Sequence, residues 1–232
     1  MSRRSFLLLP ALALVLALAL VLPVSAYSVD AESWYSQGGA LLAADNLTGA
    51  IGAYDRATTL EPGFYEAWDA KADALNRDGR FSEALAASDR ALDINTSYVR
   101  GWINRGQILY NIGYVYEDQK NDPTTANEYY NQQLLAFEKA ISLDPANAGA
   151  WFNKAYALAG MKRYDEAIAA FDKVKSLDPT YPKVDQNRQI AEKLRDSVTP
   201  FWVKYAPVLG GIAVIIIGVI AWFVFLREKK EE

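Results

Sequence analysis

Apolar and polar residues recur with helical spacing in four similar segments of the chain. The clearest copy, RYDEAIAAFDKVKSLDP, runs from Arg163 to Pro179, and looser copies are LTGAIGAYDRATTLEP, RFSEALAASDRALDIN and QQLLAFEKAISLDP. Such spacing places an apolar stripe on one face of a helix and leaves the other face polar. Because one short hairpin cannot bury its stripe alone, the repetition predicts an array in which each hairpin covers the next.

Four tryptophans mark the period of this repetition. Trp34, Trp68, Trp102 and Trp151 are 34, 34 and 49 residues apart, and the last spacing equals 34 plus an insertion of 15. The same series of small, aromatic, small and proline residues follows the first and the last tryptophan, as Ala50, Tyr54, Ala57 and Pro62, and as Ala167, Phe171, Val174 and Pro179. The pattern is broken at three positions, Ser88, Thr96 and Gln133.

This pattern resembles the tetratricopeptide repeat (TPR) family, in which a tryptophan-led helix is paired with a second helix carrying Ala-x-x-x-aromatic and a closing proline. The resemblance implies an all-α fold, a right-handed superhelical array of helix hairpins. We expect four units within residues 27–181, with bounds 31–64, 65–98, 99–147 and 148–181, the third holding the insertion. A capping helix is expected over 182–199, with one face made of Val184, Arg188, Ala191, Leu194 and Val198.

Two apolar stretches flank the expected array. Residues 1–26 begin with Arg3 and Arg4 before a Leu/Ala-rich run, which is typical of a secretory signal peptide. Residues 206–226 contain no charged side chain, and a helix of this length can cross a bilayer. A link at 200–205 and a tail at 227–232 complete the expected organisation.

The basic residues of the tail predict the orientation of this span, because Lys and Arg are enriched on the cytoplasmic side. We therefore expect a single-pass protein of the cytoplasmic membrane, with the bilayer as one partner. Its repeats are expected on the extracytoplasmic side and its C-terminus in the cytoplasm. An uncleaved N-terminal segment would leave the repeats on the same side.

Composition argues against catalysis. The chain has no His and no Cys, so it lacks the commonest general base, the thiolate nucleophile and the commonest metal ligands. We expect no enzyme activity, no cofactor and no metal site, and an accessory subunit of an envelope enzyme is the least favoured alternative. The net charge of −4 is unlike the basic surfaces that bind nucleic acid, which is therefore not an expected partner.

The family resemblance implies a concave groove lined by the first helix of each unit. We expect it to hold a segment of another envelope or secreted protein, with Phe152 and Tyr156 as anchors and with Asp69 and Asp73 facing a basic residue. Two alternatives stay open: these side chains only solvate and pack the array, or the protein self-associates as a structural element. The groove positions are Tyr35, Glu66, Asp69, Asp73, Arg77, Arg100, Ile103, Gln107, Tyr110, Phe152, Asn153 and Tyr156.

The insertion predicts a protruding hairpin, because fifteen residues shared by two helices add about two turns to each. Its tyrosines form either a second binding surface or contacts between the two long helices. They are Tyr114, Tyr116, Tyr129 and Tyr130. Candidate N-glycosylation sequons at Asn46 and Asn95 fall at expected turns between helices.

Overall fold

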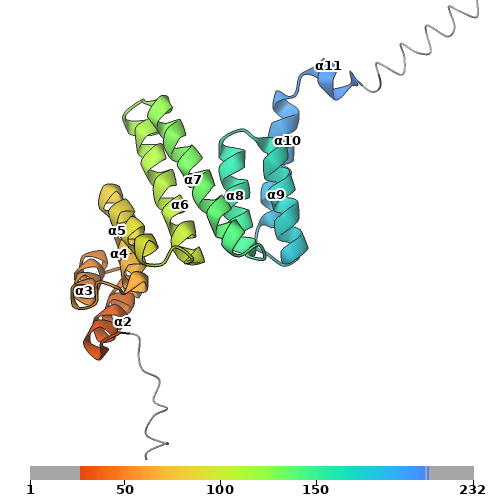
Figure 1. Ribbon diagram of the computed structural model, residues 1–232. Coiled ribbons are helices and arrows are strands. Elements are labelled where there is room, and N and C mark those ends of the chain that lie inside the picture. The colour runs from red at the N-terminus through yellow and green to blue at the C-terminus, as the bar shows by residue number, and fades with distance from the viewer. Residues whose placement is uncertain (1–26, 207, 209–232) are drawn as a thin grey trace, which may run out of the picture. The chain divides into compact units, whose positions relative to one another are not determined.

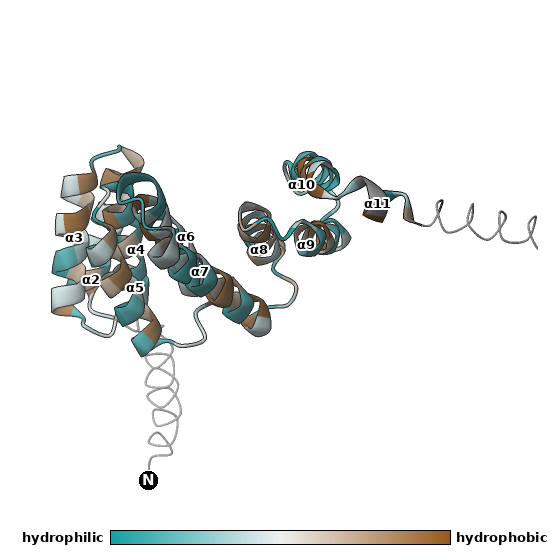
Figure 2. Ribbon diagram, turned by 90° about the horizontal axis from the view of Figure 1, so that it is seen from above, coloured by the Kyte–Doolittle hydropathy of each residue, from teal (hydrophilic) through white to brown (hydrophobic). Residues whose placement is uncertain are grey.

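The computed structural model describes residues 27–206 and 208, and this part of the chain consists of helices and turns (Figure 1). It divides into two compact units, one ending at Thr96 and the other beginning at Ser97. Figure 2 shows that most helices carry both hydrophilic and hydrophobic residues. The predicted all-α array is thus confirmed for the described residues.

The first unit contains two antiparallel hairpins. Helix α2 packs against α3, α3 against α4, and α4 against α5. Each helix has 13 to 15 residues, about four turns. The bounds are Val29–Ala43 for α2, Leu47–Leu60 for α3, Tyr65–Arg77 for α4 and Phe81–Ile94 for α5.

The second unit holds the insertion, which lengthens its first hairpin. Helix α7 has 21 residues, and a π-helical turn at Val115–Gln119 continues α6 toward the tip. The packing order is α6 on α7, α7 on α8, α8 on α9 and α9 on α10. The bounds are Val99–Tyr114 for α6, Pro123–Leu143 for α7, Ala148–Gly160 for α8, Tyr164–Leu177 for α9, Val184–Val198 for α10 and Phe201–Lys204 for α11.

The turns inside the hairpins share a left-handed residue. Asp45, Gly79 and Lys162 have φ values of 59°, 79° and 61°, and Asn121 has φ 50° at the tip of the long hairpin. A left-handed residue reverses the chain after a helix, and glycine adopts it without steric cost. The next helix then starts at Leu47, Phe81, Tyr164 or Pro123.

In each unit an aromatic ring of the core packs on the backbone of the paired helix. The Tyr54 ring lies against Gly38, where an added Cβ would be 2.5 Å from its Cε1 atom. Phe137 lies in the same way against Gly106. Small residues are therefore required where the paired helices cross, because a side chain would force them apart.

Trp68 and Trp151 lie at turns between successive hairpins and not deep in the core. The Trp68 indole nitrogen donates to the Pro62 carbonyl oxygen at 3.1 Å, and Trp151 donates to Pro145 at 3.0 Å. Both rings are only half-buried. Their role is thus to fix the turn that ends the preceding repeat.

Two sequence predictions need correction here. Leu194 and Val198, assigned to the packed face of α10, are exposed, whereas Val184 and Ala191 are buried. The predicted membrane localisation is wrong. Among residues 27–206 and 208, no helix is both long and apolar enough to cross a bilayer. Even the longest described helix, α7, carries Glu128, Glu138 and Lys139.

The expected signal peptide at 1–26 lies outside the described residues. So does the expected span at 206–226, apart from Ala206 and Val208. The tail at 227–232 is outside them as well.

Candidate functional site

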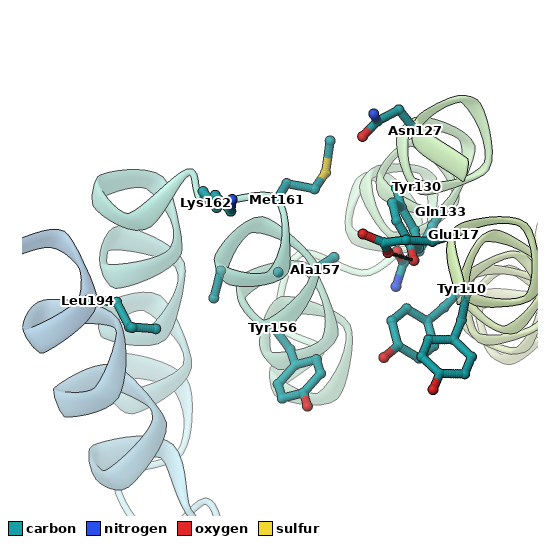
Figure 3. Close-up of a pocket in the computed structure, with 13 residues that line it drawn as sticks. Tyr110, Glu117, Asn127, Tyr130, Gln133, Tyr156, Ala157, Met161, Lys162 and Leu194 are labelled. Atoms are coloured by element: carbon teal, nitrogen blue, oxygen red, sulfur yellow. Dashed lines mark hydrogen bonds between the residues drawn. The ribbon is translucent and has the colours of Figure 1, made fainter. Parts of the chain in front are cut away.

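A cleft of about 680 Å³ lies within the second unit, between the long α6–α7 hairpin and α8. Tyrosine side chains from three helices line it: Tyr110 and Tyr114 from α6, Tyr130 from α7 and Tyr156 from α8. Figure 3 shows Tyr110 and Tyr156 on opposite sides of this space. The cleft therefore joins residues that the sequence assigned to two separate surfaces, the groove and the hairpin.

Tyr130 is the most firmly held of these tyrosines. Its ring lies on Gly113, where a Cβ would be 2.6 Å from the Tyr130 Cε1 atom, and its hydroxyl donates to Glu117 at 2.6 Å. The ring centroids of Tyr130 and Tyr110 are 6.0 Å apart. The same hairpin contains a second contact of this kind, between Gly106 and Phe137, seven residues away along each helix.

The pKa values of Tyr130 and Tyr110 are both raised by their surroundings in the cleft. Burial raises the pKa of the Tyr130 hydroxyl, and the hydrogen bond to the Glu117 carboxylate raises it further. Burial also raises the pKa of Tyr110, with smaller contributions from Tyr156 and Tyr114. Both phenols therefore stay protonated near neutral pH and can donate hydrogen bonds.

Three of the rings remain open to solvent. Tyr110, Tyr114 and Tyr156 are 40%, 48% and 55% exposed. Leu194 of α10 also lines the cleft and is exposed. Since tyrosine offers a large apolar ring with a polar tip, this arrangement can contact another molecule without rearrangement of the helices.

Gln133 is the unexpected member of the lining. It is 5% exposed, but its amide atoms are not fully buried, since Ser88 Oγ is the only fully buried side-chain polar atom without a partner in the part of the chain that the structure describes. Figure 3 shows it on the same wall as Tyr130 and Glu117. The equivalent residues of the other repeats, Ala50, Ala84 and Ala167, are fully buried. The break in the repeat pattern thus places an amide at the cleft.

Family models described as tetratricopeptide repeat match residues 11–63, 37–99 and 148–181, which together are more than half of the chain. This chain is a tetratricopeptide repeat protein. Repeats of this family generally mediate protein–protein interactions. Among the described residues no cluster of acidic side chains could hold a metal ion.

Solved structures with the same TPR fold include TTC0263 of Thermus thermophilus, with a TM-score of 0.58 and 18% identity over 77% of this chain and 98% of that one. MamA of Desulfovibrio magneticus RS-1 has a TM-score of 0.56 and 18% identity, covering 75% and 95%. YrrB, described as a TPR protein with an unusual peptide-binding site, has a TM-score of 0.53 and 19% identity, covering 73% and 79%. At these identities the likeness shows the fold alone.

A curated relative is an uncharacterized protein of Methanocaldococcus jannaschii. It is 42% identical over 65 residues, which are 28% of this chain and 66% of that protein. The chain thus spans just under two thirds of the relative's length. This similarity supports the assignment of repeats and carries no information about function.

Two predicted groove residues of the TPR array pack against aromatic rings of their own units. The Phe152 ring contacts Phe171 and Tyr181, with centroids 5.7 Å and 5.0 Å away. The Tyr35 ring lies 5.0 Å from Phe64 in the same way. Phe152 thus packs on neighbouring rings, whereas Tyr156 faces the cleft, and a role of Phe152 as an anchor stays a prediction.

The predicted acidic middle of the groove lies in the first unit and is already engaged. Asp69 is 3% exposed, and Asp73 forms an ion pair with Arg77 at 2.8 Å. Glu66 accepts a hydrogen bond from the Tyr27 hydroxyl at 3.0 Å. These contacts lie within the first unit, and a role of the three carboxylates in binding a basic residue stays a prediction.

The other predicted groove residues belong to the second unit and are not part of the cleft. Ile103 and Asn153 are half-buried and Gln107 is exposed. Arg100 is exposed, and its guanidinium lies 5.5 Å from the Tyr98 ring centroid.

The hairpin tyrosines divide between the two roles that the sequence left open. Tyr116 and Tyr129 stack with ring centroids 5.4 Å apart, and the Lys120 ammonium lies 3.8 Å from the Tyr116 ring centroid. This pair joins the two long helices. Tyr114 and Tyr130 line the cleft.

Both sequons lie at helix ends. Asn46 caps α3 by accepting a hydrogen bond from the Gly49 backbone at 3.0 Å, and Asn95 is the residue that directly follows α5. Asn46 thus has a structural role of the kind that N-cap residues serve. Glycosylation at either residue stays a prediction.

Proposed function

We propose that the tyrosine cleft of the second unit binds a segment of a partner protein. The observation that carries the proposal is the convergence of three exposed rings, Tyr110, Tyr114 and Tyr156, on one cleft with a buried amide in its wall. Exposed aromatic rings gathered around a concavity are typical of interface hot spots. YrrB, described as having a peptide-binding site, offers a precedent within the same fold.

Preorganisation supports this proposal. The Gly113 backbone and the Glu117 carboxylate hold Tyr130, and Tyr130 in turn packs beside Tyr110. A binding partner therefore loses little free energy to ordering this wall, because the side chains are already fixed. The remaining tyrosines have two main torsions each and cost little to immobilise.

A selection from a library of short random peptides tests the proposal. The full chain is the bait, and binding is then compared for a Tyr110→Ala/Tyr156→Ala variant and a Leu60→Ala/Leu135→Ala control. Leu60 and Leu135 are also exposed apolar residues, one in each unit, and neither lines the cleft. We expect selected peptides to bind the parent and the control equally and to lose about tenfold or more in affinity with the cleft variant.

Two results would contradict the proposal. One is selection of peptides that bind both variants as tightly as the parent. The other is the absence of enrichment over an unrelated bait protein.

Self-association is the second candidate, because α10 leaves an apolar stripe uncovered. Ile190, Leu194 and Val198 lie four residues apart and are all exposed, although a terminal helix of a repeat array usually has a polar outer face. Sedimentation velocity of the chain with and without Ile190→Ser/Val198→Ser tests this. A concentration-dependent dimer that the substitutions abolish favours self-association, and a monomer in both cases removes it.

A further inference from the structure

Several polar groups that line the tyrosine cleft can donate hydrogen bonds, although the hydroxyls and the amide can also accept them. Tyr110, Tyr114 and Tyr156 each present a hydroxyl, and Gln133 presents an amide that can donate two hydrogen bonds. The Tyr130 hydroxyl is already used, since it donates to Glu117. A ligand that offers acceptors between apolar surfaces therefore suits this cleft, because the apolar surfaces can pack against the rings.

Gln133 is the strongest sign of the ligand's chemistry. Alanine is the residue that the other repeats bury at this position, so the amide is a polar group that the packing of the array does not require. The amide lines the cleft, where its atoms keep contact with solvent and are accessible to a ligand. A carbonyl oxygen of a bound segment satisfies it directly.

The backbone conformation of the segment decides which acceptors it can offer. In an α-helix the carbonyl oxygens are already bonded within the helix, except in the last turn. An added β-strand needs a free strand edge, and the residues around the cleft are helical. A polyproline II segment has no internal hydrogen bonds, and its prolines carry acceptors but no N–H donors. Aromatic-lined grooves are the usual binding sites for such segments.

The charged residues of the cleft indicate which charge a bound segment carries. The charged residues in the lining are Glu117, on the hairpin wall, and Lys162, at the end of α8. The Glu117 Oε2 atom accepts from Tyr130, which leaves Oε1 for a further donor. Glu117 is exposed, so a Lys or Arg side chain can reach it.

We propose that the tyrosine cleft binds an extended, proline-containing segment of a partner protein, with a basic residue of that segment next to Glu117. Gln133 donates to a backbone carbonyl of the segment, and the rings of Tyr110, Tyr114 and Tyr156 pack against its prolines. This inference rests on the proposed function and specifies the occupant of the same site.

Fluorescence anisotropy with synthetic peptides tests whether the cleft prefers a proline-containing segment. One labelled peptide contains a run of prolines followed by arginine, and a matched peptide of the same length and charge has alanine in place of each proline. We expect the full chain to bind the proline peptide about tenfold or more tightly than the alanine peptide. Replacing the arginine by glutamine should weaken binding and remove most of its dependence on salt.

Two variants of Gln133 separate recognition from folding. Gln133→Ala introduces the residue that the other repeats bury, and Gln133→Met keeps a similar volume without hydrogen-bonding capacity. Both should leave the melting temperature equal to or above that of the parent and reduce the affinity for the proline peptide about tenfold. Unchanged affinity in both variants would overturn the role of Gln133.

The outcomes distinguish this inference from the function on which it rests. If the alanine peptide binds as well as the proline peptide, or if cleft-dependent peptides from the random library lack proline, the polyproline II occupant is wrong and segment binding stands. If neither the proline peptide nor any library peptide responds to Tyr110→Ala/Tyr156→Ala, both proposals fail.

Discussion

The Tyr54 ring lies against the backbone of Gly38 so closely that a methyl group at position 38 would be 2.5 Å from the ring. Tyr54 is buried and cannot move aside without displacing the helices around it. The neighbouring Gly39 has no such contact, since an added Cβ would be 3.9 Å from the Tyr54 hydroxyl oxygen. Two adjacent glycines of α2 therefore differ in what they tolerate.

Gly38→Ala should destabilise the first unit by about 1–3 kcal/mol, because overpacking outweighs the better helix propensity of alanine. Gly39→Ala should stabilise it by up to about 1 kcal/mol, since only the propensity changes. Urea unfolding followed by circular dichroism checks both. Equal effects of the two substitutions would contradict the proposed packing of Tyr54.

The left-handed turn residues give a second pair of opposite predictions. Asp45 and Gly79 occupy the same turn of two successive hairpins, with φ of 59° and 79°. Asp45→Gly should raise the free energy of unfolding by about 0.5 kcal/mol by removing backbone strain, and Gly79→Ala should lower it by about 1 kcal/mol by introducing such strain. An added Cβ at Gly79 meets no neighbour within 4 Å, so the loss reports backbone conformation alone. Urea midpoints that move in the same direction for the two substitutions would contradict this role of the left-handed turn residues.

The Tyr130–Glu117 hydrogen bond predicts a loss of stability in alkaline solution. The pKa of Tyr130 is raised in the folded protein, so above about pH 10 the unfolded chain loses this proton while the folded chain retains it. Stability from this group is therefore complete below about pH 10 and falls as the pH rises further. Tyr130→Phe should make the decrease in urea midpoint between about pH 9 and pH 11 smaller than in the parent. An identical decrease would show that Tyr130 contributes nothing.

The fold was largely predictable from the sequence because its determinants are local and periodic. The tryptophan spacing and the small and aromatic positions identify the hairpins, and the structure pairs Gly38 with Tyr54 and Gly106 with Phe137 as that pattern requires. The buried face of α10 was mispredicted because apolar residues spaced by three or four positions can be assigned to either of two adjacent faces of a helix. Ala191 is buried, while Leu194, three residues later, is exposed.

The site was only partly predictable, because it depends on which side chains of separate helices meet. Phe152 has the same sequence signal whether it anchors a partner or packs on Tyr181, and its contact with Tyr181 follows only from the tertiary structure. Gln133 was visible in the sequence as a break in the repeat. Its position in the cleft wall beside Tyr130 follows only from the tertiary structure.

Site-specific photocrosslinking tests the central claim, that the tyrosine cleft holds a segment of another protein. A photoreactive phenylalanine analogue replaces Tyr156 in the full chain, or Leu135 as an exposed control outside the cleft. After illumination in the producing cells, the account predicts a discrete adduct to a different protein from position 156 and none from position 135. Adducts between two copies of the chain, equal adducts from both positions, or no adduct from position 156 would contradict it.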